Sequence, residues 1–201
     1  MLAGSASAET LEDRCAQATP RCPVLACNEG LIREVREDYA RGDLVELLRH
    51  TEKEDRHLDD ESTPLTRKGI EQAEAIHEGL TRTGLIPSNV QVSSYTRTRG
   101  TAARAVPRRE NQTWGEPPEL RKDRCFDTMP EFVQAESRTK GNSVYVTHSS
   151  CIFSMLYVNR YQYFDPTGEE NYGVMIFLDR KNLHKPIACM WPSDWRLWPM
   201  R

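Results

Sequence analysis

The chain has 201 residues, of which 27 are lysine or arginine and 30 are aspartate or glutamate, so its formal net charge is −3 with the five histidines neutral. A chain of this length suits one domain. Charged residues make up 28% and the two signs nearly balance, which is typical of a folded domain and not of a disordered polyanion. The lack of a basic excess argues against nucleic acid as the main partner.

The first part of the chain differs from the rest. We expect residues 1–40 to form an N-terminal arm and residues 41–201 the folded domain. The Ala6-Ser7-Ala8 triplet resembles the small-x-small sites that precede signal-peptidase cleavage, although the charged and apolar regions of a signal are missing. It fits either the remnant of an export signal or a small-residue tail. No apolar stretch approaches the roughly 20 residues that cross a bilayer, so we expect no stable membrane insertion.

Cysteine is the residue type that bears on redox state and metal binding. The six cysteines are Cys15, Cys22, Cys27, Cys125, Cys151 and Cys189. They form no CxxC pair and no CxxC…HxxxH pattern, so we expect no metal site and no cofactor. The even count allows disulfides among the first three if the protein is exported. Ordinary buried thiols are the alternative, especially for Cys151, which lies in an apolar run.

The predicted elements alternate along the chain. Residues 29–41 are compatible with a helix. Residues 44–48 form an apolar run of strand length, and a polar loop follows. Thr66 is expected to cap a helix with one apolar stripe, which stops near Gly84. Residues 90–93 are strand-like, and residues 97–106 favour a helix.

The second half repeats this order after a loop over residues 107–130. The pattern predicts a helix over 132–137, a strand over 143–147, a buried helix over 151–158 and a strand over 174–178. Strands that alternate with helices favour a mainly parallel sheet with both faces covered. The predicted fold is therefore α/β, a three-layer sandwich with a mainly parallel central sheet flanked by helices.

Basic side chains follow three of the predicted strands. Arg49 and His50 end the first strand, Arg97 follows the second, and His148 follows the third. In open α/β sheets the binding crevice lies beyond the carboxyl ends of the strands, so these residues can meet there. Guanidinium groups suit a bidentate grip on phosphate oxygens. The sequence therefore predicts a small cationic pocket for a phosphoryl group.

Four segments also carry a family resemblance. Residues 48–52 resemble the Arg-His-Gly/Ala-Glu motif of the histidine phosphatase superfamily, the phosphoglycerate mutase-like proteins of branch 1. Residues 65–73 are similar to the Leu-Thr-x-x-Gly-x-x-Gln-Ala helix start of that family. Residues 92–102 resemble its Ser-Pro-x-x-Arg-Ala-x-x-Thr-Ala segment, and residues 144–150 its Val-x-Val-Thr-His-Gly-Gly strand end. The segments occur in the order of the family.

The resemblance implies a mechanism and a set of roles. His50 would attack phosphorus and form a phosphohistidine that water then hydrolyses, while Arg49, Arg97 and His148 would hold the phosphoryl oxygens, with no metal or cofactor. An acid of this family lies about two dozen residues after the pocket arginine. Asp123 is the first candidate for this acid. The alternatives are Glu119 and Glu131.

The departures from the family pattern narrow the expected function. Thr51 replaces a glycine or alanine, and Ser149 and Ser150 replace two glycines. The segments have a looser resemblance to the periplasmic lipopolysaccharide core heptose-phosphate phosphatases. We therefore expect hydrolysis of a small phosphomonoester, such as a sugar phosphate, in the periplasm or another export compartment, with the cytoplasm as the alternative. A protein phosphohistidine phosphatase and a non-catalytic binder of phosphorylated ligands are the competing functions.

Overall fold

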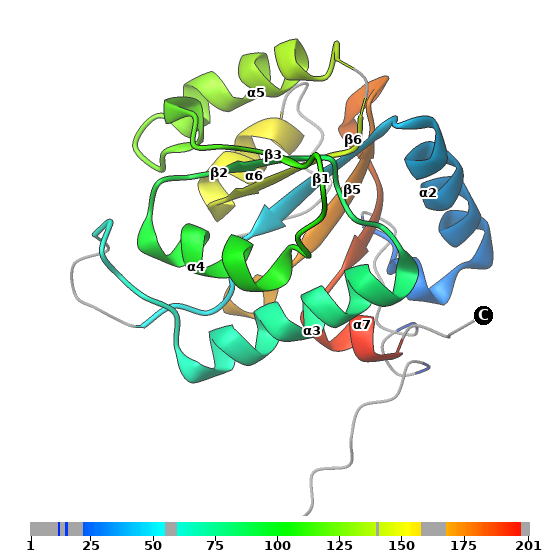
Figure 1. Ribbon diagram of the computed structural model, residues 1–201, viewed down its shortest axis with the longest axis horizontal. Helices are drawn as coiled ribbons and strands as arrows, with labels where there is room; N and C mark the ends of the chain where they lie inside the picture. The colour runs from blue at the N-terminus through cyan, green and yellow to red at the C-terminus, as the bar shows by residue number, and fades with distance from the viewer. Residues whose placement is uncertain are drawn as a thin grey trace, which may run out of the picture.

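A computed structural model describes Glu12, Cys15 and residues 22–54, 60–139, 141–157 and 168–197. Its described strands form one sheet in the order β3-β2-β4-β1-β5-β6 (Figure 1). The strands are β1 Leu44–Arg49, β2 Asn89–Val92, β3 Thr113–Gly115, β4 Ser143–Thr147, β5 Met175–Asp179 and β6 Asn182–Met190. Neighbours from β3 to β1 are parallel, whereas β5 is antiparallel to both β1 and β6. The predicted α/β class with a mainly parallel sheet is confirmed.

Helices cover both faces of this sheet (Figure 1). They are α2 Glu29–Arg41, α3 Arg67–Thr83, α4 Thr96–Ala105, α5 Cys125–Glu136, α6 Ser149–Tyr157 and α7 Pro192–Leu197, with short 3₁₀ turns η1 Leu25–Cys27, η2 Pro118–Leu120 and η3 Glu169–Asn171. One buried cluster joins the sheet to α2, α3, α4 and α7. A second cluster joins the other face to α5 and α6. The sandwich therefore has two apolar cores, one on each side of the sheet.

Helix α3 illustrates how the sequence sets an element. The Thr66 hydroxyl accepts from the Gly69 backbone N–H at 2.9 Å, and Gly84 ends the helix at a φ of 73°. Gly69 also lets the helix approach the loop after β1, because a Cβ there would lie 2.0 Å from the carbonyl oxygen of Glu52. The apolar stripe of α3, which includes Ile76, is buried against the sheet. The predicted start and stop of this helix are confirmed.

The second half of the chain contains elements that the sequence did not predict. The expected loop over 107–130 holds β3, η2 and the start of α5, which begins at Cys125 and not near residue 132. Strand β6 was missed because it is interrupted by Pro186, where its register with β5 shifts. The fourth predicted strand is antiparallel to β1, since β5 and β6 form a hairpin.

All six cysteines are in disulfides: Cys15–Cys27, Cys22–Cys189 and Cys125–Cys151, with Cα separations of 5.4, 5.6 and 5.1 Å. The interpretation of Cys151 as a buried thiol is wrong, because an apolar environment accommodates a bridged sulfur as well as a thiol. The Cys15–Cys27 bond lies among the first three cysteines, as the sequence allows, whereas Cys22 pairs outside them because the chain folds so that Cys22 meets β6 next to the Val24–Cys189 bridge. This packing holds the described arm residues against the sheet.

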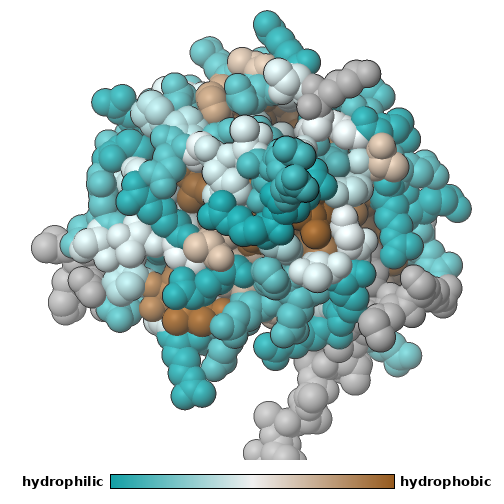
Figure 2. Space-filling model, in the orientation of Figure 1, coloured by the Kyte–Doolittle hydropathy of each residue, from teal (hydrophilic) through white to brown (hydrophobic). Residues whose placement is uncertain are grey.

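The predicted domain boundary at residue 40 stays a prediction, and the Ala6-Ser7-Ala8 triplet lies outside the described residues. On the face shown in Figure 2, hydrophilic residues predominate and apolar residues form small separate patches. None of the described helices is long and apolar enough to span a bilayer. Within the same described ranges, no cluster of three or more His, Cys, Asp or Glu side chains could hold a metal ion.

Candidate active site

Three adjacent strands, β2, β4 and β1, end at the same edge of the sheet and place the predicted basic residues there. The backbone N–H of His50 donates to the Thr147 carbonyl at 3.0 Å, and that of Ser93 donates to the Val146 carbonyl at 3.0 Å. These bonds hold the three strand ends side by side. The ring centroids of His50 and His148 are consequently 5.4 Å apart.

The side chains at this edge are almost completely buried. Arg49 and His50 are each 4% exposed, His148 is 1% exposed and Arg97 is 0% exposed. Arg97 lies in the first turn of α4, directly after the Ser93–Tyr95 turn. Its Nη1 donates to the carbonyl oxygen of Asp60 at 2.9 Å. Four basic side chains thus come together at this edge of the sheet with little exposure to solvent.

The His50 ring has a defined hydrogen bond. Its Nδ1 lies 2.9 Å from the backbone carbonyl oxygen of Thr51. Because a carbonyl oxygen only accepts, this contact places a proton on Nδ1 and leaves the lone pair of the neutral ring on Nε2. Burial lowers the His50 pKa to about 3, opposed by the Thr51 bond and reinforced by the charges of Arg97 and Arg49. The imidazole is therefore neutral at physiological pH.

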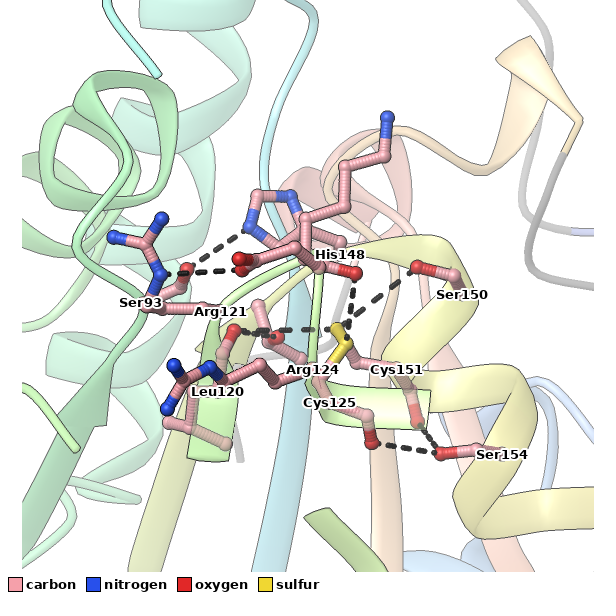
Figure 3. Close-up of a disulfide and its surroundings, with 12 residues drawn as sticks. Ser93, Leu120, Arg121, Arg124, Cys125, His148, Ser150, Cys151 and Ser154 are labelled. Carbon is pink, nitrogen blue, oxygen red and sulfur yellow. Dashed lines mark hydrogen bonds and ion pairs between the residues drawn. A yellow bond between two sulfur atoms is a disulfide. The ribbon is translucent and has the colours of Figure 1, made fainter. Parts of the chain in front are cut away.

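The His148 ring is the second imidazole of the site, and Ser93 and Tyr95 contact it. The Ser93 hydroxyl and His148 Nε2 share a hydrogen bond of 2.9 Å (Figure 3), and the Tyr95 ring packs edge-on at 4.7 Å between centroids. His148 Nδ1 is buried and has no hydrogen-bond partner among the described residues. Burial, and then the positive charge of its surroundings, lowers the His148 pKa well below its usual value. Its Nδ1 is available for a ligand.

Two tyrosines pack against the two arginines. The Arg49 guanidinium lies 4.2 Å from the Tyr172 ring centroid and also donates to the Gly168 carbonyl. The Arg97 guanidinium lies 4.6 Å from the Tyr95 ring centroid. Such stacking restricts the planes of the guanidinium groups without competing for their N–H donors. Sequence reasoning missed both tyrosines and Ser93, although the position of Ser93 at a strand end, within the family-like segment, was a usable signal.

Thr51, one of the departures from the family pattern, has a structural role. Its backbone N–H donates to the Thr101 hydroxyl at 3.0 Å, and the two hydroxyl oxygens are 3.1 Å apart. The Thr101 hydroxyl also donates to the Arg97 carbonyl at 2.9 Å. The extra hydroxyl of Thr51 therefore connects the loop after His50 to the helix that carries Arg97.

The three candidate acids lie outside this buried cluster. The Asp123 side chain is 53% exposed, and Arg121 Nε donates to its carboxylate at 3.1 Å. Desolvation favours a higher pKa, but the hydrogen bond and charge of Arg121 outweigh it and leave the Asp123 pKa lowered. Glu119 is half-buried in η2, and Glu131 is exposed on α5. A proton donor needs a raised pKa, so Asp123 in this arrangement is a carboxylate paired with arginine.

The loop that carries Asp123 is fastened beside His148 (Figure 3). The Cys125–Cys151 disulfide joins the start of α5 to the first turn of α6, which follows His148 directly. The Thr147 hydroxyl donates to the Leu120 carbonyl at 3.2 Å from the end of β4. The loop from η2 to α5 is therefore attached to β4 and α6 at both of its ends.

The sequence and the fold have known counterparts. Residues 45–121 match the family model of the histidine phosphatase superfamily, branch 1. That span contains Arg49, His50 and Arg97, and the fold places His148 next to them. No curated protein matches this chain in sequence.

Solved structures resemble the fold of this chain over most of its length. The protein histidine phosphatase SixA complexed with tungstate has a TM-score of 0.60 and 16% identity, covering 75% of this chain and 98% of that one. SixA of Agrobacterium tumefaciens has a TM-score of 0.58 and 17% sequence identity, covering 74% of this chain and 97% of that one. Phosphoglycerate mutase of Bacillus anthracis has a TM-score of 0.50 and 16% sequence identity, covering 78% of this chain and 97% of that one. The expected phosphoglycerate mutase-like fold is confirmed.

Proposed function

We propose that the protein hydrolyses a small phosphomonoester through a phosphohistidine intermediate on His50. The observation that carries the proposal is the state of His50: a buried neutral imidazole with its Nδ1 proton bonded to Thr51 and its Nε2 lone pair unprotonated. A nucleophile must be unprotonated at the working pH, and a fixed tautomer removes the need to reorient before attack. Two buried guanidinium groups and a second imidazole lie beside it.

In the first step, His50 Nε2 attacks phosphorus in line with the ester oxygen. The N–P bond forms while the P–O bond to the leaving group breaks. Arg49 and Arg97 neutralise the phosphoryl oxygens, and His148 donates from Nδ1 while Ser93 donates to its Nε2. Phosphoryl transfer depends mainly on positioning and on charge stabilisation, which these groups supply without a metal ion.

In the second step, water attacks the phosphohistidine and gives a proton to the carboxylate that protonated the leaving group in the first step. The N–P bond breaks, inorganic phosphate forms, and the lone pair returns to His50 Nε2. The leaving group of the first step takes a proton, and a carboxyl group of the loop before β4 is the proposed donor. Asp123 is the first choice and Glu119 the second. For Asp123, the substrate must displace Arg121 before the carboxyl group can hold a proton.

Burial of the site favours a small substrate over a protein. The reacting imidazoles are only 4% and 1% exposed, whereas a phosphohistidine on a protein surface needs an open pocket. The ring centroids of Tyr172 and His50 are 5.6 Å apart. Tyr172 also lines a surface cavity of about 300 Å³, together with Lys68 and Trp191. This volume accommodates a small molecule.

The experiment compares the wild type with His50→Ala on p-nitrophenyl phosphate. We expect the variant to lose turnover by at least about 1,000-fold, since its nucleophile is gone. Acid quenching of the wild type should trap a phosphoenzyme that is labile in acid and stable in base. Equal turnover by both proteins would refute the mechanism. Tight phosphate binding without turnover by either would favour a non-catalytic binder, and turnover only with a phosphohistidine protein would favour the protein phosphatase.

The proposal includes an oxidising compartment, in line with the periplasmic or otherwise exported location that the sequence suggests. Three disulfides among six cysteines support it, because reducing compartments rarely retain such bonds. Alkylation of the protein in intact cells, before and after reduction, tests this. Six cysteines protected until reduction are expected, and six reactive thiols in the untreated cells would place the protein in the cytoplasm.

A further inference from the structure

We propose that the Cys125–Cys151 disulfide is a positioning element of the active site, which holds the acid-bearing loop in place for protonation of the leaving group. The inference rests on the proposed function. It concerns a bond that links the first residue of α5 to the helix just after His148.

The disulfide lies close to the catalytic residues in the chain and in space. Cys151 is in the first turn of α6, and the backbone N–H of its neighbour Ile152 donates to the His148 carbonyl at 3.1 Å. Cys125 is two residues after Asp123, and its backbone N–H donates to the Arg121 carbonyl at 2.8 Å. Both sulfur-bearing residues are 0% exposed. A shift of either end would therefore pass directly to the site.

The other described contacts that hold the loop are the Thr147–Leu120 hydrogen bond at its η2 end and the apolar packing of α5 on α6. The Ser154 hydroxyl lies 3.4 Å from the Cys125 carbonyl oxygen and 2.8 Å from that of Cys151, so its stronger bond is within its own helix. The Arg121 side chain bonds to Glu61, Asp123 and Ser94, none of which belongs to α6. Apolar packing between α5 and α6 is not directional at the scale of one proton transfer. The covalent bond supplies the positional restraint that these contacts lack.

Loss of the Cys125–Cys151 disulfide should slow protonation of the leaving group more than attack on phosphorus. His50, Arg49 and Arg97 are positioned by β1, β2 and α4, which the bond does not touch. His148 is held at the end of β4 by the His50–Thr147 backbone bond and by the Ser93 hydroxyl, neither of which involves the disulfide. Attack on phosphorus is then preserved, whereas a carboxyl group displaced by about 1 Å protonates the leaving group poorly. A good leaving group needs little protonation and a poor one needs much. The dependence of the rate on the leaving group therefore reports the position of the loop.

The test uses two substrates of similar shape, p-nitrophenyl phosphate and phenyl phosphate, whose leaving groups differ in basicity. The variant is the double substitution Cys125→Ala/Cys151→Ala. We expect the ratio of kcat/KM for the nitrophenyl ester to that for the phenyl ester to rise by about 10-fold or more, mainly through kcat on the phenyl ester. The matched control is Cys15→Ala/Cys27→Ala, which removes a disulfide that is remote from the site in the chain and should leave the ratio unchanged.

The outcomes separate the two proposals. A ratio that stays at the wild-type value, whether both rates fall together or neither falls, overturns the positioning role. Turnover that survives His50→Ala overturns the proposed function instead. If the alanine pair does not fold, Cys125→Ala/Cys151→Val refills the space.

Discussion

The middle of β1 carries a carboxyl group in the protein interior. Glu46 is 0% exposed, and neither of its carboxyl oxygens has a hydrogen-bond partner among the described residues. Its neighbours across the sheet are Val144 and Phe177. Burial raises the Glu46 pKa from 4.5 to about 8, because the charged form loses its hydration and gains nothing in return. The group is therefore protonated at neutral pH.

This raised pKa makes folding depend on pH in a definite direction. The folded state binds the proton more tightly than the unfolded chain, so the stability contribution is complete below pH 4.5 and is lost as the pH rises to about 8. The shift of roughly 3.5 pKa units corresponds to about 5 kcal/mol at 1.36 kcal/mol per unit. At pH 7, which is 2.5 units above the unfolded value, about 3 kcal/mol has already been lost.

The substitution Glu46→Gln removes the titration and keeps the shape. Urea denaturation followed by tryptophan fluorescence gives the free energy of unfolding of both proteins at pH 5 and pH 8. The wild type should lose stability relative to the variant as the pH rises. We expect the free energy of unfolding of Glu46→Gln minus that of the wild type to be about 3 kcal/mol larger at pH 8 than at pH 5. Glu74→Gln, at an exposed position of α3, is the control and should show no such change. Parallel curves for wild type and Glu46→Gln would refute the reasoning.

Three further substitutions test the scaffold of the site. Gly69→Ala places a Cβ 2.0 Å from a backbone carbonyl of the loop after His50, so kcat on p-nitrophenyl phosphate should fall by about 100-fold; an unchanged kcat contradicts the close packing. Ser93→Ala leaves a buried ring nitrogen unpaired and should lower kcat/KM by about 10-fold, with no loss if the hydroxyl is dispensable. Cys22→Ala/Cys189→Ala opens a bridge with a sequence separation of 167 and should lower the free energy of unfolding by about 4 kcal/mol, which an unshifted urea midpoint would disprove.

The pattern of strands and basic residues was predictable because local signals and the topology agree. The run at residues 44–48 is buried on both faces, as expected for a central strand, and its end carries Arg49 and His50. The capping residue Thr66 and the glycine stop at residue 84 define α3 without reference to the rest of the fold. Because parallel strands end at one edge, four residues far apart in sequence could be placed together.

The elements that escaped prediction depend on long-range contacts. Strand β6 pairs with β5 across a hairpin, and Pro186 breaks its strand-like pattern, so only the pairing defines it. Cys22 and Cys189 meet because the arm returns to the far edge of the sheet. The paired state of Cys125 and Cys151 likewise depends on the packing of α5 on α6. No local sequence signal carries such information, since it arises from the assembled sheet.

The same cations that make the site attractive to phosphate keep its imidazoles neutral. In the free protein, burial and the charges of Arg97 and Arg49 disfavour a proton on His50, and the effect on His148 has the same direction. A phosphoryl dianion that enters this field cancels much of it, so the pKa values of both rings rise on binding. In the proposed mechanism, His50 is thus ready to attack in the free protein. His148 gains positive character only when there is a phosphoryl oxygen to receive its hydrogen bond. Binding and activation are therefore coupled through charge in a chain whose total charge is only −3.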